Sequence, residues 1–444
     1  MAIKTIYQKL VNALFFLILL TLSNELLAQD ESKTEELRLN IQLRPRAEVR
    51  NGLFTPILEG QQPATFISQR SRVGLTYSKH QKLKIGVSMQ VVNTWGNDPQ
   101  VQATANNISL YEGWAQLNFT PAWNLKVGRQ VFSYDDERIL GSLDWNNAGR
   151  KHDAVLLGFG KNKLTINLAA AYSQNGEKVT GTFYDSAISQ PYKGMEFLWS
   201  EYKFTDAFTV SALVLNIDIQ SRSDSLLSHL QTAGANIFYK KNKLNLAGTY
   251  YYQAGKNSVK NSSSIKTNAW MAAVKADYHF NDVFGIGAGS DYLSGRDMNA
   301  ASSRITYFNP LYGTHHKFYG FMDYFYAASG HNNTGLWDSY LNLNLNSSKK
   351  MSWQAALHHF ESTAKVVSYT GSVAGSSLGN ELDLTFKCTV MDDVKLSGGY
   401  SQMFVSPSMK YVKGILPLQH IKPLQNWVWL SLNINPDILI LKSK

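Results

Sequence analysis

The stretch LRLNIQLRPRAEVR, residues 37–50, alternates between apolar and polar side chains along almost its whole length. In a β-strand successive side chains point to opposite faces, so a period of two separates an apolar face from a polar one. The apolar row is Leu37, Leu39, Ile41, Leu43, Ala47 and Val49, and the polar row is Arg38, Asn40, Gln42, Arg44, Arg46, Glu48 and Arg50. One face suits lipid and the other suits water, which predicts a strand of a transmembrane β-barrel.

The same alternation recurs along the chain, for example in LNLNLN at residues 341–346. Runs of roughly 9 to 13 such residues, bounded by turn residues, give the strand count. Eighteen strands are expected, near 37–50, 66–77, 83–95, 108–119, 123–132, 152–160, 163–173, 194–204, 207–219, 231–240, 243–253, 268–280, 283–294, 336–346, 350–361, 378–387, 393–403 and 426–434. The fold class is therefore all-β, a transmembrane antiparallel up-and-down barrel.

The links between these strands alternate strictly between short and long, and the longest covers about residues 295–335. Outer-membrane barrels join their strands by short periplasmic turns and long outer loops. The alternation predicts an even strand number and two periplasmic termini. An aromatic girdle is expected at the short-turn ends. Its members are Tyr77, Phe119, Trp123, Phe159, Phe204, Phe208, Tyr239, Tyr278, Phe280 and Phe284.

The first 28 residues are expected to be a secretory signal peptide. Lys4 and Lys9 precede an apolar run, and Leu26-Leu27-Ala28 offers a cleavage point before Gln29. Residues 29–444 then form a single barrel domain in the cell outer membrane. After Gln29 no window approaches the roughly 18 uncharged apolar residues of a helical span, which excludes a helical membrane protein. Pro436 would break a ladder hydrogen bond, so a short C-terminal tail is expected after residue 434.

The chain carries a formal net charge of +10 and one cysteine, Cys388. A lone cysteine forms no internal disulfide, so an exported chain needs another source of stability, which a closed sheet in a bilayer supplies. The basic charge favours an anionic partner, either lipid headgroups or an acidic solute. Nucleic acid is excluded as a partner because an exported chain does not meet it and no recognition motif appears.

Three segments resemble the alginate-export family of outer-membrane proteins. They are LRPRAEVRNG from Leu43, QRSRVG from Gln69 and, above all, VGRQVFSYDDERILGSLDWNNAGRKHD from Val127 to Asp153. The resemblance extends over most of the chain after residue 28. It implies an 18-stranded barrel with an electropositive pore for an anionic polysaccharide. The passenger itself does not follow from the match, because pore charge is less specific than fold.

Arginines on the inward parity are the candidate pore-lining residues. Arginine holds carboxylates through a planar, always-charged fork, which suits an acidic saccharide. The candidates are Arg44, Arg46, Arg50, Arg70, Arg72, Arg129, Arg138 and Arg150. Strict alternation points Arg129 toward lipid, and a bulge at Gly128 would be needed to turn it inward. The alternative is that these arginines pair with Glu48, Glu112 or other acids and only brace the wall.

The loop at residues 133–151 mixes acids with bases and is a candidate constriction. Its acids are Asp135, Asp136, Glu137 and Asp144. Acid and base close together would make an inward-folded loop self-paired and rigid, which suits a selectivity element. The alternative is a solvated surface loop.

The functional hypothesis is a passive conduit for an anionic oligo- or polysaccharide, with no enzyme activity, catalytic residue, cofactor or metal. His315-His316 and His358-His359 lack the helical spacing of a zinc site. Two alternatives stand beside this hypothesis, a general porin for small solutes and a surface-binding barrel that uses the 295–335 loop. Insertion of such a barrel is expected to need the barrel-assembly machinery.

Overall fold

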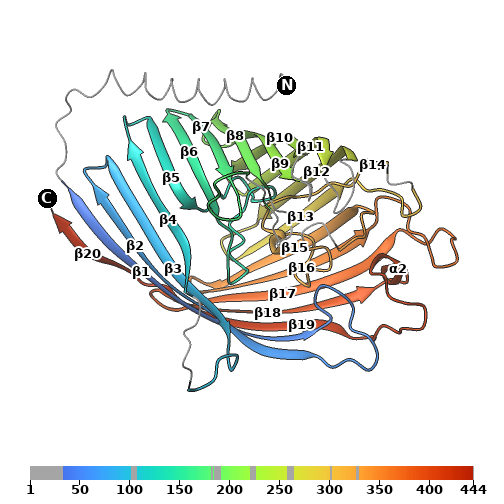
Figure 1. Ribbon diagram of the computed structural model, residues 1–444. Coiled ribbons are helices and arrows are strands. Elements are labelled where there is room, and N and C mark those ends of the chain that lie inside the picture. Colours follow the sequence, from blue (N-terminus) through green and yellow to red (C-terminus); the bar gives the residue numbers. More distant parts are fainter. Residues whose placement is uncertain are drawn as a thin grey trace.

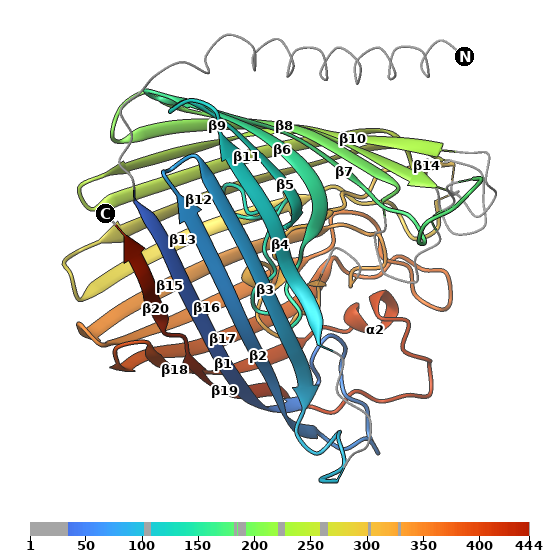
Figure 2. The same cartoon turned by 60° about the vertical axis from the view of Figure 1, so that its left-hand side comes forward.

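The computed structural model describes residues 34–101, 108–181, 184, 192–220, 227–257, 265–300, 303–326 and 330–443. The expected signal peptide lies outside the described residues. The strands wind into a closed antiparallel barrel, and the first and last strands lie side by side (Figures 1 and 2). Within the described chain no helix has the length and apolarity to cross a membrane.

Eighteen strands form the barrel wall. They are β1 (Glu35–Asn51), β2 (Ala64–Lys79), β3 (Leu83–Thr94), β4 (Ser109–Asn118), β5 (Trp123–Gln130), β6 (His152–Lys161), β7 (Leu164–Tyr172), β8 (Gly194–Lys203), β9 (Phe208–Gln220), β10 (Leu227–Lys241), β11 (Leu244–Asn257), β12 (Ile265–His279), β13 (Phe284–Leu293), β15 (Leu336–Ser348), β16 (Met351–Glu361), β17 (Ser377–Met391), β18 (Val394–Val405) and β19 (Gln425–Ile434). All eighteen predicted strands are confirmed, with ends that differ by at most four residues.

Four shorter elements accompany the wall. The two-residue strand β14 (Arg304–Ile305) pairs with β12, and η1 (His315–Lys317) lies in the same long loop. The helix α2 (Met409–Val412) lies in the β18–β19 link, and β20 (Asp437–Ser443) ends the chain. The short links and the long links open at opposite ends of the barrel, called here the short-turn end and the long-loop end.

The barrel closes where β1 pairs with β2 on one side and with β19 on the other. The segment after residue 434 is not a free tail, because β20 pairs with the first half of β1. Leu43 pairs with Ile434 and Asn40 with Asp437, so the register continues across Pro436. Proline has no N–H to donate, yet its carbonyl still accepts a hydrogen bond from Ile41 N at 3.1 Å. The loss of one ladder bond does not end the strand.

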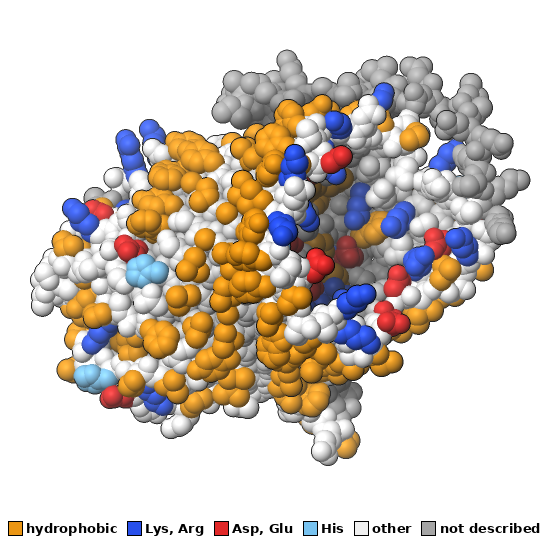
Figure 3. Space-filling view, turned by 180° about the vertical axis from the view of Figure 1, so that it is seen from behind, with side chains coloured by type: hydrophobic (Ala, Val, Ile, Leu, Met, Phe, Trp, Pro, Cys, Tyr) orange, Lys and Arg blue, Asp and Glu red, His pale blue; other side chains and the backbone are white. Residues whose placement is uncertain are grey.

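The outer face is apolar and carries two aromatic bands. Val73, Leu75 and Val87 are 51, 46 and 40% exposed, as lipid-facing side chains are, and hydrophobic side chains spread over the outer surface (Figure 3). At the short-turn end Trp123 packs against Phe159 and Phe280 against Phe284, with ring centroids 4.8 and 5.5 Å apart. A second band, not predicted from the sequence, runs through Tyr250, Trp270, Tyr292 and Trp337.

The inner face has a polar part on β1 and β2 and an apolar part on β8 to β12. Leu213, Leu215 and Ile217 of β9 point inward and are at most 2% exposed. They belong to one hydrophobic cluster with Phe132, Leu140 and other residues of the long links. This explains why β9 is apolar on both parities. One face meets lipid and the other meets loops that fill the barrel.

Candidate functional site

Five arginines line one side of the lumen and are called here the arginine wall. They are Arg44, Arg46 and Arg50 of β1 and Arg70 and Arg72 of β2. The period of two points all five inward, and the β1–β2 register places Arg44 directly opposite Arg70. Arg44, Arg46 and Arg70 are only 9, 6 and 1% exposed. Like charges that face each other on neighbouring strands repel, so this arrangement needs acids nearby.

Two carboxylates serve the arginine wall. Glu48 accepts hydrogen bonds from Arg46 Nε and Arg50 Nε, each at 2.9 Å. Asp144 accepts from Arg44 Nη1 at 3.1 Å and from Arg70 Nη2 at 2.8 Å. Among the described residues, five arginines therefore share two ion-paired acids, and the buried Asp323 is a further acid that attracts Arg46 and Arg50. The alternative that these arginines only brace the wall explains their ion pairs with Glu48 and Asp144. It does not explain why the arginines outnumber the acids that pair with them.

Asp144 comes from the loop at residues 133–151, which enters the barrel. Its segment 144–148, called here the strap, lies along the arginine wall. Trp145 O accepts from Arg46 Nη1 at 2.8 Å, Asn147 Oδ1 accepts from Arg44 Nη2 at 2.9 Å, and Ala148 O accepts from Gln90 Nε2 at 2.9 Å. The guanidinium of Arg46 also lies 4.1 Å from the centroid of the Trp145 ring. Burial would raise the pKa of Asp144, but Arg70 and Arg44 outweigh it and hold that pKa below its ordinary value.

Asp135 and Arg138 fix this loop to the opposite side of the lumen, and Asp136 and Glu137 bind within the loop. Asp136 and Asp291 of β13 both bind the guanidinium of Arg138, whose side chain is 6% exposed. Asp135 accepts from Trp199 Nε1 at 3.0 Å and from Ser211 Oγ at 2.5 Å, and burial raises its pKa. Glu137 accepts from Ser133 Oγ at 2.7 Å and from Ser142 N at 3.0 Å. The candidate constriction loop thus lies inside the barrel and is not a solvated surface loop.

The described part of the long loop at residues 295–335 also lies inside. Tyr312 N donates to Ile139 O at 3.0 Å, and Gly141 N donates to Tyr312 O at 2.9 Å, so the two loops pair with each other. Met322 N donates to Glu381 Oε1 at 2.7 Å, and Phe321 N donates to Asp383 Oδ2 at 3.2 Å. Residues 133–151 and 303–326 together are called here the plug. The surface-binding alternative would leave aromatic residues of this loop exposed, whereas Phe308 and Tyr312 are 0 and 6% exposed.

The β18–β19 link holds the plug from the long-loop end. Lys413 Nζ donates to the carbonyl oxygens of Tyr324 and, at 3.0 Å, of Phe54. Burial lowers the pKa of Lys413 to about 7. Lys413, Asp291, Glu381 and Asp383 were not among the predicted site residues. The sequence alternation is enough to show that the three acids point inward. It does not identify their partners, which lie 59 to 153 residues away along the chain.

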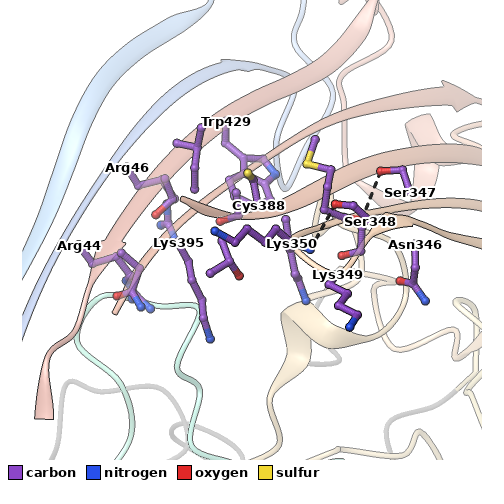
Figure 4. Close-up of a pocket in the computed structure, with 18 of the residues that line it drawn as sticks. Arg44, Arg46, Asn346, Ser347, Ser348, Lys349, Lys350, Cys388, Lys395 and Trp429 are labelled. Atoms are coloured by element: carbon purple, nitrogen blue, oxygen red, sulfur yellow. Dashed lines mark hydrogen bonds between the residues drawn. The ribbon is translucent and has the colours of Figure 1, made fainter. Parts of the chain in front are cut away.

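A cavity of about 950 Å³ opens at the short-turn end beside the strap. Figure 4 shows Arg44, Arg46 and Trp429 around it together with Lys349, Lys350 and Lys395. Six basic residues and two acidic ones, Asp144 and Asp282, line this space. A hollow flanked by basic and acidic side chains is visible in Figure 3. The lysines of the short turns were missed because basic residues in turns are ordinarily read as solvated.

Two predicted site residues belong elsewhere. Arg129 lies on the outer surface, which corrects its assignment to the lumen. Its parity is that of the exposed Val127, and its guanidinium binds both carboxylate oxygens of Asp153 at 2.8 Å. Strict alternation gives the correct orientation of Arg129, because Gly128 does not turn the Arg129 side chain inward. Arg150 belongs to the plug, where its Nη1 donates to Gly313 O at 2.8 Å.

A closed 18-stranded antiparallel barrel with an apolar outer face and a charged lumen defines an outer-membrane channel. The chain belongs to the alginate export family, whose sequence profile matches residues 35–406. No curated sequence matches the chain closely enough to count as a relative.

Solved porin-like barrels share the fold. Acinetobacter baumannii OccAB4 superposes with a TM-score of 0.61 at 11% identity, over 91% of this chain and 98% of that one. Pseudomonas aeruginosa OpdK, solved with vanillate, gives a TM-score of 0.58 at 9% identity over 90 and 99%. Acinetobacter baumannii OccAB1 gives 0.59 at 12% identity over 92 and 100%. At these identities the likeness concerns the fold alone.

Proposed function

We propose that this outer-membrane channel passes small anionic solutes, with acidic mono- and oligosaccharides as the leading class, by attraction to the arginine wall. The observation that carries the proposal is that five arginines on two adjacent strands share only two ion-paired acids among the described residues. A guanidinium binds a carboxylate through two parallel hydrogen bonds. Weak contacts in a wet pore also permit release, so passage needs no covalent chemistry.

The plug favours a small passenger over a polymer. It packs against the inner face of β8 to β12 and leaves the arginine wall covered by the strap. A polysaccharide chain would require the plug to leave the lumen, whereas a small solute requires only the strap to yield. The alternative of a general porin agrees with this proposal on the size of the solute. It differs because a general porin would have no preference for anions. The OpdK barrel was solved with vanillate, a small carboxylate, which agrees with passage of small anions through this fold.

The same proposal assigns an orientation. The short-turn end with its basic cavity faces the periplasm, and so do both chain termini. Removal of residues 1–28 and insertion by the barrel-assembly machinery complete the proposed maturation. A surface-binding role of the 295–335 loop is not proposed, because the described part of that loop lies in the lumen.

The experiment is solute flux into liposomes that hold the purified full-length chain. Glucuronate and glucose have nearly the same size and differ by one negative charge. The proposal expects glucuronate to enter faster than glucose and the preference to shrink in Arg46→Gln/Arg72→Gln. Equal rates for the two sugars, or faster entry of glucose, would establish a general porin.

A further inference from the structure

Asp144 stands between the cavity and the buried Arg70, and Arg44 lies beside it at the cavity wall. The Asp144 side chain is 58% exposed, whereas the Arg44 and Arg70 side chains are 11 and 1% exposed. The cavity reaches Arg44, Asp144 and Trp145 and does not reach Arg70. A solute that enters from the short-turn end therefore meets the carboxylate of Asp144 before it meets Arg70.

The buried arginines have hydrogen-bonding capacity left over. Within the described part of the chain, Arg44 Nε and Arg70 Nε and Nη1 are buried without a hydrogen-bond partner. The same holds for Trp429 Nε1, a cavity-lining donor on β19. Buried donors are ordinarily satisfied, and a buried charge even more so. Asp144 therefore leaves several donors of these arginines without an acceptor.

The strap presents to the wall the oxygens that an acidic saccharide would present. Asp144 offers a carboxylate, Trp145 and Ala148 offer carbonyls, and Asn147 offers an amide oxygen. Its two ends have backbone conformations in the left-handed region, at Leu143 with φ 52° and Gly149 with φ 63°. The strap thus offers the wall the polar groups of a ligand, while the Trp145 ring anchors it by stacking on His316, with ring centroids 4.2 Å apart.

We propose that Arg44 and Arg70 form a carboxylate-binding site which Asp144 occupies in the resting channel, and that a passenger carboxylate binds there by displacing Asp144. The inference rests on the proposed function and deepens it, because it names the recognised group and the contact that competes with it. The exchange balances charge, since one carboxylate replaces another on the same two guanidinium groups. Trp429 Nε1 supplies a donor for a neighbouring hydroxyl or carboxylate oxygen of the passenger.

The test is block of single-channel current by glucuronate added at the short-turn side of a planar bilayer. Asp144→Asn removes the competing charge and keeps the side-chain volume. Its half-blocking concentration should fall about tenfold, at the lower end of what a charge-assisted hydrogen bond contributes. Asp277→Asn is the matched control, because it removes one acid from the β12 face of the lumen, where Asp277 pairs with Lys275 at 3.1 Å. Its half-blocking concentration should stay within about twofold of wild type, since a distant screened charge acts weakly.

A second variant tests displacement itself. Asn147 Nδ2 donates to Ser68 Oγ at 3.0 Å, so cysteines at these two positions, in a Cys388→Ser background, lie within reach of a short bis-methanethiosulfonate cross-linker that ties the strap to β2. The cross-linked channel should lose glucuronate block, and reduction should restore it. Unchanged block with the strap tied, or equal shifts in Asp144→Asn and Asp277→Asn, would overturn the inference. A wild-type channel that prefers cations would instead overturn the proposed function, so the two failures are distinguishable.

Discussion

The ion pair between Arg138 and Asp291 is the contact whose loss should open the channel most clearly. The two side chains are 6 and 1% exposed, and Arg138 Nη2 donates to Asp291 Oδ1 at 3.2 Å. Removal of one member of a buried pair leaves a charge uncompensated, which costs about 3–5 kcal/mol. Asp136 Oδ2 remains 2.6 Å from Arg138 Nε. We therefore expect Asp291→Asn to weaken docking of the plug by about 3 kcal/mol, the lower end of that range.

A loss of about 3 kcal/mol is about a 150-fold change in the ratio of released to docked plug. Single-channel recording measures that ratio as the fraction of time spent in a higher conductance level. The control is Asp153→Asn, which removes an acid from the exposed outer pair with Arg129, where the side chains are 35 and 57% exposed. An exposed pair contributes about 1 kcal/mol or less, so that control should change the ratio by less than about fivefold. An Asp291→Asn channel with the open fraction of wild type would refute this account of the plug.

Two pH dependences follow from the loop residues. The pKa of Asp144 lies below its ordinary value because the attraction of Arg70 and Arg44 outweighs the effect of burial. The ion pairs of Asp144 are therefore fully present above about pH 5. They are lost only as the pH falls through the lowered pKa, below about pH 4. Maleimide labelling of Ala148→Cys in a Cys388→Ser background is divided by the rate of a free model thiol at the same pH, because only the thiolate reacts. This ratio should stay low from pH 8 to 5 and rise below about pH 4; a rise near pH 6 would contradict this. Burial lowers the pKa of Lys413 to about 7, so the unfolded chain binds more protons between about pH 7 and 10 and stability should rise across that window. The melting temperature of wild type should climb over this range more steeply than that of Lys413→Met, and parallel curves would argue against a buried Lys413.

The strands were predictable because the signal is local. A side chain's face follows from its parity alone, and the lengths of the links supply an independent count. The same rule placed Arg129 outward, and its assignment to the lumen depended on a bulge at Gly128. Pro436 suggested a free tail because it lacks one hydrogen-bond donor, whereas the pairing of β20 with β1 depends on residues about 400 positions apart in the sequence.

The plug was not predictable in the same way. Docking of residues 133–151 depends on Asp291 and Tyr312, and docking of the long loop depends on Glu381 and Asp383. Neither set is local in sequence. The sequence of β9 contains one indication of the plug. Its apolar residues occur on both parities, so its inner face must pack against apolar residues, as its outer face packs against lipid. That pattern indicates a filled lumen, although it does not say which loop fills it.

The central claim is that the arginine wall makes the channel select anions. Reversal potentials in a KCl gradient across a planar bilayer test it most directly, with Arg129→Gln as the control that removes an arginine from the outer surface. Wild type and Arg129→Gln should both prefer chloride over potassium, and Arg46→Gln/Arg50→Gln/Arg72→Gln should lose most of that preference. A cation-preferring wild-type channel, or a chloride preference that survives loss of the three arginines, would contradict the account.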